Sequence, residues 1–217
     1  MSLIMKIFKP NECAKIKKKE DLVSSILDNN FSIPKKFSNL LNSFDDLMSS
    51  PDSYLSLIEK LIVSMNGNIR YPRIGDNNER FDAFIEFCEY DSVVEIEIPS
   101  TAILDAPRNL LDDYAIMLSR NKMTKKPIIP LVICWDLPNK RSDYWNVIQD
   151  IRKVLNLQIK TISIPALALH YWSKTKLDLL NEYYLDIEHQ KMHLAYELMS
   201  NNNIPSHKAL GYLEPLK

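Results

Sequence analysis

The sequence predicts an α/β protein in which helices flank a central mixed β-sheet. Two adjacent runs, 80–90 and 92–100, alternate apolar and polar residues and predict a pair of antiparallel strands. Predicted helices at 106–121 and 142–156 then alternate with predicted strands at 127–135 and 157–164. Since strands that alternate with helices form parallel pairs covered on both faces, the complete order predicts a mixed sheet.

The N-terminal region predicts helices only. Apolar residues at spacings of three and four predict helices over 15–30 and 34–50. A more clearly marked helix follows at 49–65, where Pro51 suits the first turn and Gly67 ends the helix before a polar loop.

These elements predict three regions. They are a helical N-terminal extension at 1–48, an α/β core at 49–172, and a helical C-terminal region at 173–217. The apolar side chains of the last region can close the core or form a two-fold interface, so that both a monomer and a homodimer agree with the sequence.

Composition excludes several classes of protein. The chain has 217 residues, 46% of them hydrophobic, and a net charge of −1, which is typical of a globular protein and gives no overall attraction to nucleic acid. Its three glycines provide no GxGxxG, P-loop or GxSxG motif, and its three cysteines form no CxxC pair. No apolar run is long enough to span a bilayer, so we expect a cytoplasmic protein without a membrane partner.

Acidic residues interrupt the predicted hairpin. Glu95 and Glu97 are two apart on one strand and therefore point to the same face, and Asp82 lies on the partner strand. Carboxylates brought together repel one another and either take up protons or bind a cation, and oxygen ligands of this kind suit Mg²⁺. The alternative is that these acids are the solvated half of an amphipathic hairpin.

The order of the acids and elements resembles the PD-(D/E)XK nuclease superfamily, to which many restriction endonucleases belong. Phe81-Asp82 stands where the family has Pro-Asp, Glu95-Ile96-Glu97 stands where it has (D/E)-x-K, and Glu59 matches an acid of the first family helix. The resemblance covers roughly 50–170. The layout is similar to FokI-type cleavage domains, and the Glu-x-Glu is similar to BamHI and BglII, in which an acid replaces the usual lysine.

The resemblance implies a restriction-endonuclease-like core and assigns roles to these residues. Asp82 and Glu95 would hold Mg²⁺, or Mn²⁺ as a substitute, together with the main-chain carbonyl of Ile96. Glu97 cannot act as the usual lysine, but it can accept a proton from the attacking water. Glu59 would be a supporting ligand, although an acid on the polar side of a helix needs no special role.

The function implied is a metal-dependent DNA endonuclease, either a type II restriction enzyme or the cleavage subunit of a larger restriction system. The alternative is a non-catalytic nuclease-fold subunit for DNA binding or assembly. A protein-interaction domain built on the C-terminal helices is a further alternative. His189 and His193 have the spacing of a zinc pair on a helix, but Gln190 does not fit the HExxH pattern.

Double-stranded DNA requires a basic surface, since neutralising phosphates supplies most of the affinity. The alternative for any such cluster is a solvated face. The candidate residues are Arg70, Arg73, Arg120, Lys122, Lys125, Lys126, Lys140, Arg141, Lys15 and Lys17 to Lys19.

Overall fold

The computed structural model of the chain has the predicted α/β architecture. It describes residues 20–28, 30–72, 80–99, 102–120, 125–138, 142–180, 197–198 and 200–204. In chain order the elements are α2 (Ile33–Asn42), α3 (Phe44–Met48), α4 (Pro51–Ser64), β1 (Asn68–Arg70), β2 (Ala83–Glu86), β3 (Asp91–Glu97), α5 (Ala106–Arg120), β4 (Ile128–Cys134), α6 (Asp143–Leu155), β5 (Lys160–Ser163) and α7 (Ile164–Trp172). None of the helices in these ranges is long and apolar enough to cross a membrane.

The strands form one five-stranded mixed sheet in the order β1-β2-β3-β4-β5. β2 runs antiparallel to both β1 and β3, whereas β3, β4 and β5 run parallel. The hairpin and the two following helix-strand units predicted from the sequence are confirmed.

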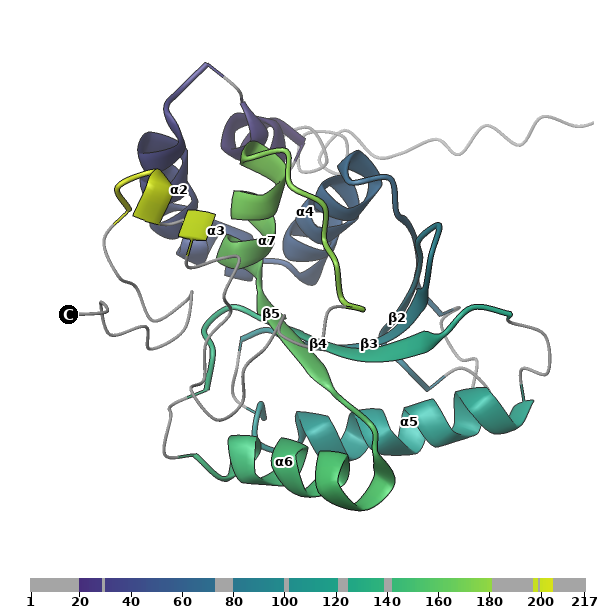
Figure 1. Ribbon diagram of the computed structural model, residues 1–217. Helices are drawn as coiled ribbons and strands as arrows, with labels where there is room; N and C mark the ends of the chain where they lie inside the picture. The colour runs from purple at the N-terminus through teal and green to yellow at the C-terminus, as the bar shows by residue number, and fades with distance from the viewer. Residues whose placement is uncertain are drawn as a thin grey trace, which may run out of the picture.

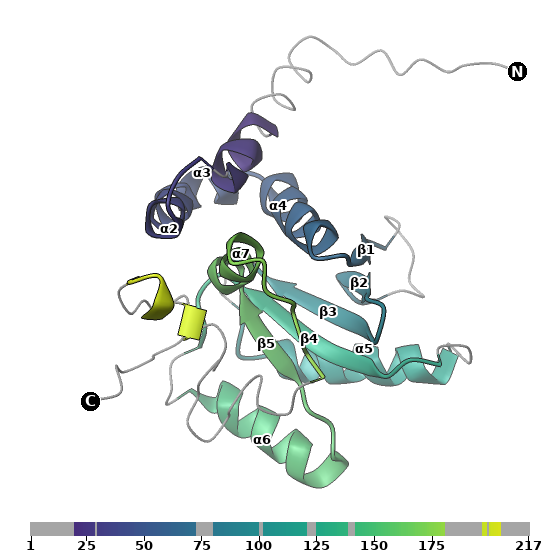
Figure 2. The same ribbon diagram turned by 45° about the horizontal axis from the view of Figure 1, so that its top comes forward.

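Helices cover both faces of the sheet (Figure 1). α5 and α6 lie on one face, and α4 and α7 lie on the other, with α2 and α3 beyond them; Figure 2 shows the same separation after rotation. α5 packs on β3 and β4, so the central strands are enclosed. All seven residues of β4 are buried, as expected for a parallel strand between two helical layers.

The sheet has one strand more than the sequence predicts. α4 ends at Ser64, and Asn66, with a φ of 64°, makes the turn in the left-handed region. The Gly67 N–H donates to the Ile62 carbonyl over 3.0 Å at the end of α4, and a Cβ on Gly67 would lie 2.7 Å from Ile62 Cγ2 and Phe87 Cε1. After this close approach of Gly67 to Ile62 and Phe87, the chain enters β1. The three residues of β1 are too few to show an alternation of apolar and polar residues in the sequence.

Two further details differ from the prediction. The hairpin turns at 87–90, where the Phe87 N–H donates to the Tyr90 carbonyl over 2.9 Å, and Asp91 begins β3 as a buried residue. The predicted C-terminal helical region does not begin at 173. Residues 173–180 form turns and irregular structure instead, and Lys174 within them has a φ of 54°. His189 and His193 lie outside the described residues.

Candidate functional site

Asp82 is joined to β3 through both its backbone and its side chain. Its N–H donates to the Val94 carbonyl over 3.1 Å, and its Oδ2 accepts a hydrogen bond from the Ile96 N–H over 2.8 Å. Ala83 pairs with Val94, so Asp82 lies across from Glu95 at the end of the hairpin. The structure therefore brings together Asp82 and the Glu-x-Glu segment, which sequence reasoning placed on neighbouring strands.

Glu95 is the buried acid of this group. Its side chain lies on the face covered by α5, where Asn109 Nδ2 donates to Glu95 Oε1 over 3.3 Å. The residue is 8% exposed, so the interpretation as a solvated hairpin face does not hold for Glu95. Glu97 lies on the same face of β3 and is half-buried.

α5 presents polar residues to these carboxylates at a spacing of four. Asp105 directly precedes α5, and Asn109 and Asp113 follow within the helix at the same spacing of four, so the three residues lie along one side of it. Burial and the charge of Asp82 raise the pKa of both glutamates, and Asp105 adds to this effect on Glu97 as Asp113 does on Glu95. Sequence reasoning missed this side of α5, although the spacing within DAPRNLLDD was a signal for it.

Burial raises the pKa of each acid in the group, and the charge of Asp82 adds to this effect for Glu95 and Glu97. Burial and then the charge of Asp82 raise the pKa of Glu95 to about 7, although the Asn109 hydrogen bond partly opposes them. Burial, Asp82 and Asp105 raise the pKa of Glu97, while a hydrogen bond from the Ala102 backbone lowers it. Desolvation also raises the pKa of Asp82, against the effect of the Ile96 N–H.

Asp113 adds a further acid to the group along α5, and this acid is paired with the guanidinium of Arg80. Burial raises its pKa, the Arg80 guanidinium lowers it, and Asp112 and Asp82 raise it. Arg80 contacts Asp112 Oδ2 through Nη1 over 2.9 Å and Asp113 Oδ1 through Nε over 3.8 Å. Arg80 was not among the basic residues singled out from the sequence.

Helix α4 approaches the group through a residue other than the predicted one. Burial, followed by the charge of Asp82, raises the pKa of Tyr54 in α4. Glu59 is exposed, and its charge adds to the effect of burial in raising the pKa of Tyr71. Tyr54 of α4 therefore lies close enough to Asp82 for the charge of that carboxylate to act on its hydroxyl.

The donor set suits a hard divalent cation. Asp82 and Glu95 are carboxylates that repel one another, and a cation between such groups would relieve the repulsion that raises the pKa of Glu95. Within the described residues, no three His, Cys, Asp or Glu side chains converge closely enough to hold a metal ion by themselves. Mg²⁺ commonly takes one or two carboxylates and keeps several waters, so two carboxylates and the Ile96 carbonyl would suffice in number.

The predicted DNA-contacting residues have different surroundings. Lys126 Nζ donates to the Phe87 carbonyl over 2.8 Å and contacts buried Asp91, so it secures the hairpin turn. The Arg70 guanidinium lies over the rings of Phe81 and Phe84. Arg120 and Lys125 are exposed. The remaining candidates lie outside the described residues: Arg73, Lys122, Lys140, Arg141, Lys15 and Lys17 to Lys19.

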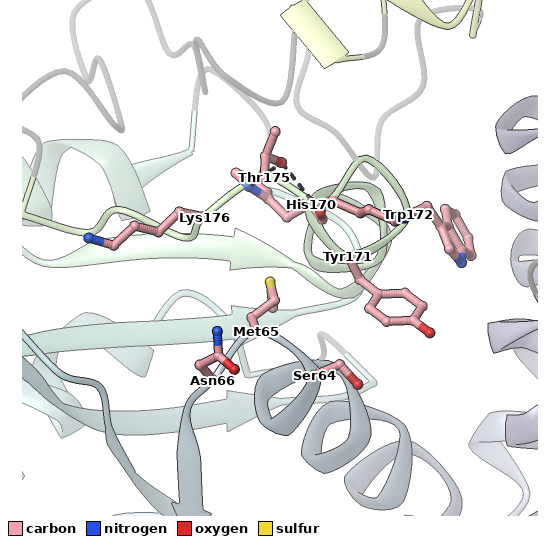
Figure 3. Close-up of a pocket in the computed structure, with 9 residues that line it drawn as sticks. Ser64, Met65, Asn66, His170, Tyr171, Trp172, Thr175 and Lys176 are labelled. Carbon is pink, nitrogen blue, oxygen red and sulfur yellow. Dashed lines mark hydrogen bonds between the residues drawn. The ribbon is translucent and has the colours of Figure 1, made fainter.

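A pocket of about 610 Å³ lies away from the carboxylates. Figure 3 shows the residues that line it, which come from the end of α4 and from α7 with the segment that follows, on the face of the sheet opposite α5. Burial lowers the pKa of His170 in its wall to about 4, and Thr175 Oγ1 lies 3.3 Å from His170 Nδ1. The pocket and the acids are separate features of the structure.

No protein-family model matches this chain, and a search of curated proteins finds no match to it.

Proposed function

We propose that the chain is a metal-dependent DNA endonuclease of the restriction-endonuclease-like fold, either a type II restriction enzyme or the cleavage subunit of one. The observation that carries the proposal is the group formed by Asp82, Glu95 and Glu97 at one end of a mixed sheet, under α5. Its strand order, with a hairpin followed by two parallel strands, agrees with the fold that the sequence resembles.

In this proposal each acid has a separate task. Asp82 and Glu95, with the Ile96 carbonyl, would hold Mg²⁺ or Mn²⁺, and the Ile96 N–H and Asn109 fix the two carboxylates in place. The cation would supply Lewis-acid polarisation of the phosphodiester and of a water molecule. Glu97, whose pKa burial and Asp82 raise, would accept the proton of the attacking water.

Cleavage of supercoiled plasmid and of mixed genomic DNA, with Mg²⁺ and then Mn²⁺, tests the proposal. Metal-dependent cutting by the unaltered protein, lost in Asp82→Ala and Glu95→Ala, is the expected result. Glu97→Gln should retain metal binding but lose cutting, because the amide cannot accept the proton. Glu86→Gln is the control, since Glu86 is an exposed acid of the same hairpin.

The second candidate is a non-catalytic subunit with the same fold. It is favoured by the finding that no three metal-binding side chains converge among the residues in the described ranges. It predicts DNA binding without cutting on either substrate, and that result would contradict the endonuclease.

A further inference from the structure

We propose that Arg80 binds a backbone phosphate of the DNA beside the carboxylates, with the buried Asp113 holding its guanidinium at the site and the phosphate competing with the exposed Asp112 for it. The inference rests on the proposed function, because Arg80 would be the cation that lets DNA bind at an acidic site.

The acids create the need for such a group. Asp82 lies across from Glu95 at the end of the hairpin, Glu97 lies on the same face of β3 as Glu95, and Asp113 lies one helical turn from Asn109, so carboxylates are concentrated there. A phosphodiester brings further negative charge, and the repulsion between charges at contact distance is strong near a protein surface. A cation on the protein at the edge of the acids offsets this repulsion when DNA approaches.

Arg80 has the position and the geometry for this task. It stands two residues before Asp82, and its guanidinium reaches Asp112 and Asp113 of α5. Asp113 lies one helical turn beyond Asn109, which contacts Glu95. Arg80 therefore lies against the same side of α5 that faces the carboxylates.

The Arg80 guanidinium stays accessible although one of its two acidic partners is buried. The Asp113 side chain is 7% exposed, whereas the Arg80 side chain is 55% exposed. A guanidinium has five N–H donors in a planar fork, and the contacts to the two aspartates use Nε and Nη1. A planar fork that stays partly accessible suits bidentate binding of a phosphate.

Arg108 offers a matched comparison. It is 53% exposed and also contacts two aspartates, Asp105 over 3.7 Å and Asp143 over 3.1 Å. Both of those partners are largely exposed, and Asp143 belongs to α6. Arg108 therefore connects the N-terminal end of α5 to α6, so Arg108→Ala removes an equal charge without removing a contact to Asp112 or Asp113.

The experiment measures binding of a short mixed-sequence duplex as a function of salt, with Ca²⁺ and under conditions in which the duplex is recovered intact. Arg80→Ala should weaken binding about tenfold, the loss of one charge-assisted contact. It should also reduce the slope of log affinity against log salt by about 0.9, the value for one phosphate. Arg80→Lys should restore the slope, and Arg108→Ala should leave both quantities close to those of the unaltered protein.

Asp112→Asn separates phosphate binding from a structural ion pair. If Arg80 binds phosphate, removing the exposed Asp112 charge leaves the affinity for the duplex equal or higher. Any gain in affinity disappears when Arg80 is also replaced by alanine. If the pair merely secures α5 to the hairpin, Asp112→Asn weakens binding as Arg80→Ala does, and the inference is overturned.

Two other outcomes have distinct meanings. Equal affinity and slope for Arg80→Ala and Arg108→Ala would overturn the inference while leaving the endonuclease intact. Absence of salt-dependent binding by the unaltered protein would overturn the proposed function, and the inference with it.

Discussion

Replacing Glu95 by glutamine should stabilise the protein at high pH and leave it nearly unchanged at low pH. The pKa of Glu95 is raised from 4.5 to about 7, with burial as the largest cause. A folded-state pKa above the unfolded value means that the folded state holds the proton more tightly, so its stability falls as the pH rises from 4.5 to 7. With about 1.4 kcal/mol for each pKa unit, ionising Glu95 removes about 3 kcal/mol from the free energy of unfolding.

Glutamine has the shape of the protonated acid and keeps an oxygen for the Asn109 Nδ2. Urea unfolding of both proteins between pH 4 and 8 measures the effect, with the advantage of Glu95→Gln expected to grow by about 3 kcal/mol across that range. Glu86→Gln is the control, because Glu86 is an exposed acid of the same hairpin and its side chain contacts Asn68 rather than the acids beside α5. A stability difference between Glu95→Gln and the unaltered protein that does not change with pH would refute the reasoning.

Three further substitutions test neighbouring parts of the structure. Asn109→Ala removes the donor that lowers the pKa of Glu95, so the fall in stability should move to higher pH in the same urea series; an unchanged midpoint would contradict that role. Gly67→Ala places a Cβ against Ile62 and Phe87 and should cost about 1–3 kcal/mol in urea unfolding. The rate of DNA cleavage per folded molecule of Gly67→Ala should stay constant, because Gly67 lies beyond the end of β2 that is opposite to Asp82. Lys126→Ala leaves Asp91, which is 3% exposed, without its ammonium partner and should destabilise by about 1–3 kcal/mol. Weaker DNA binding without loss of stability would show instead that Lys126 contacts DNA.

The strands were predictable where alternation was long enough to identify them. β3 and β4 each have seven residues, and the hairpin and the two later units followed from the pattern. β1 has three residues and depends on the close approach at Gly67, which is a tertiary contact. A pattern of neighbours along the chain carries no information about such a contact.

The candidate site was predictable only in part, for a similar reason. Alternation places Glu95 and Glu97 on one face, but it cannot show that α5 buries Glu95 or that Asn109 meets it. Lys126 looks like a solvated charge in the sequence because its partner Asp91 is distant along the chain. Arg80 was overlooked because a single basic residue forms no cluster, and its role depends on which acids the fold places beside it.

Calorimetric titration with Mn²⁺ at pH 8 most directly tests whether the acids form a cation site. At this pH Glu95, with a pKa of about 7, is ionised and repels Asp82, so a cation should bind the unaltered protein and Glu86→Gln alike. Asp82→Ala and Glu95→Gln should each lose that binding. Binding of equal strength in Asp82→Ala, or no binding by the unaltered protein, would contradict a metal site between β2, β3 and α5.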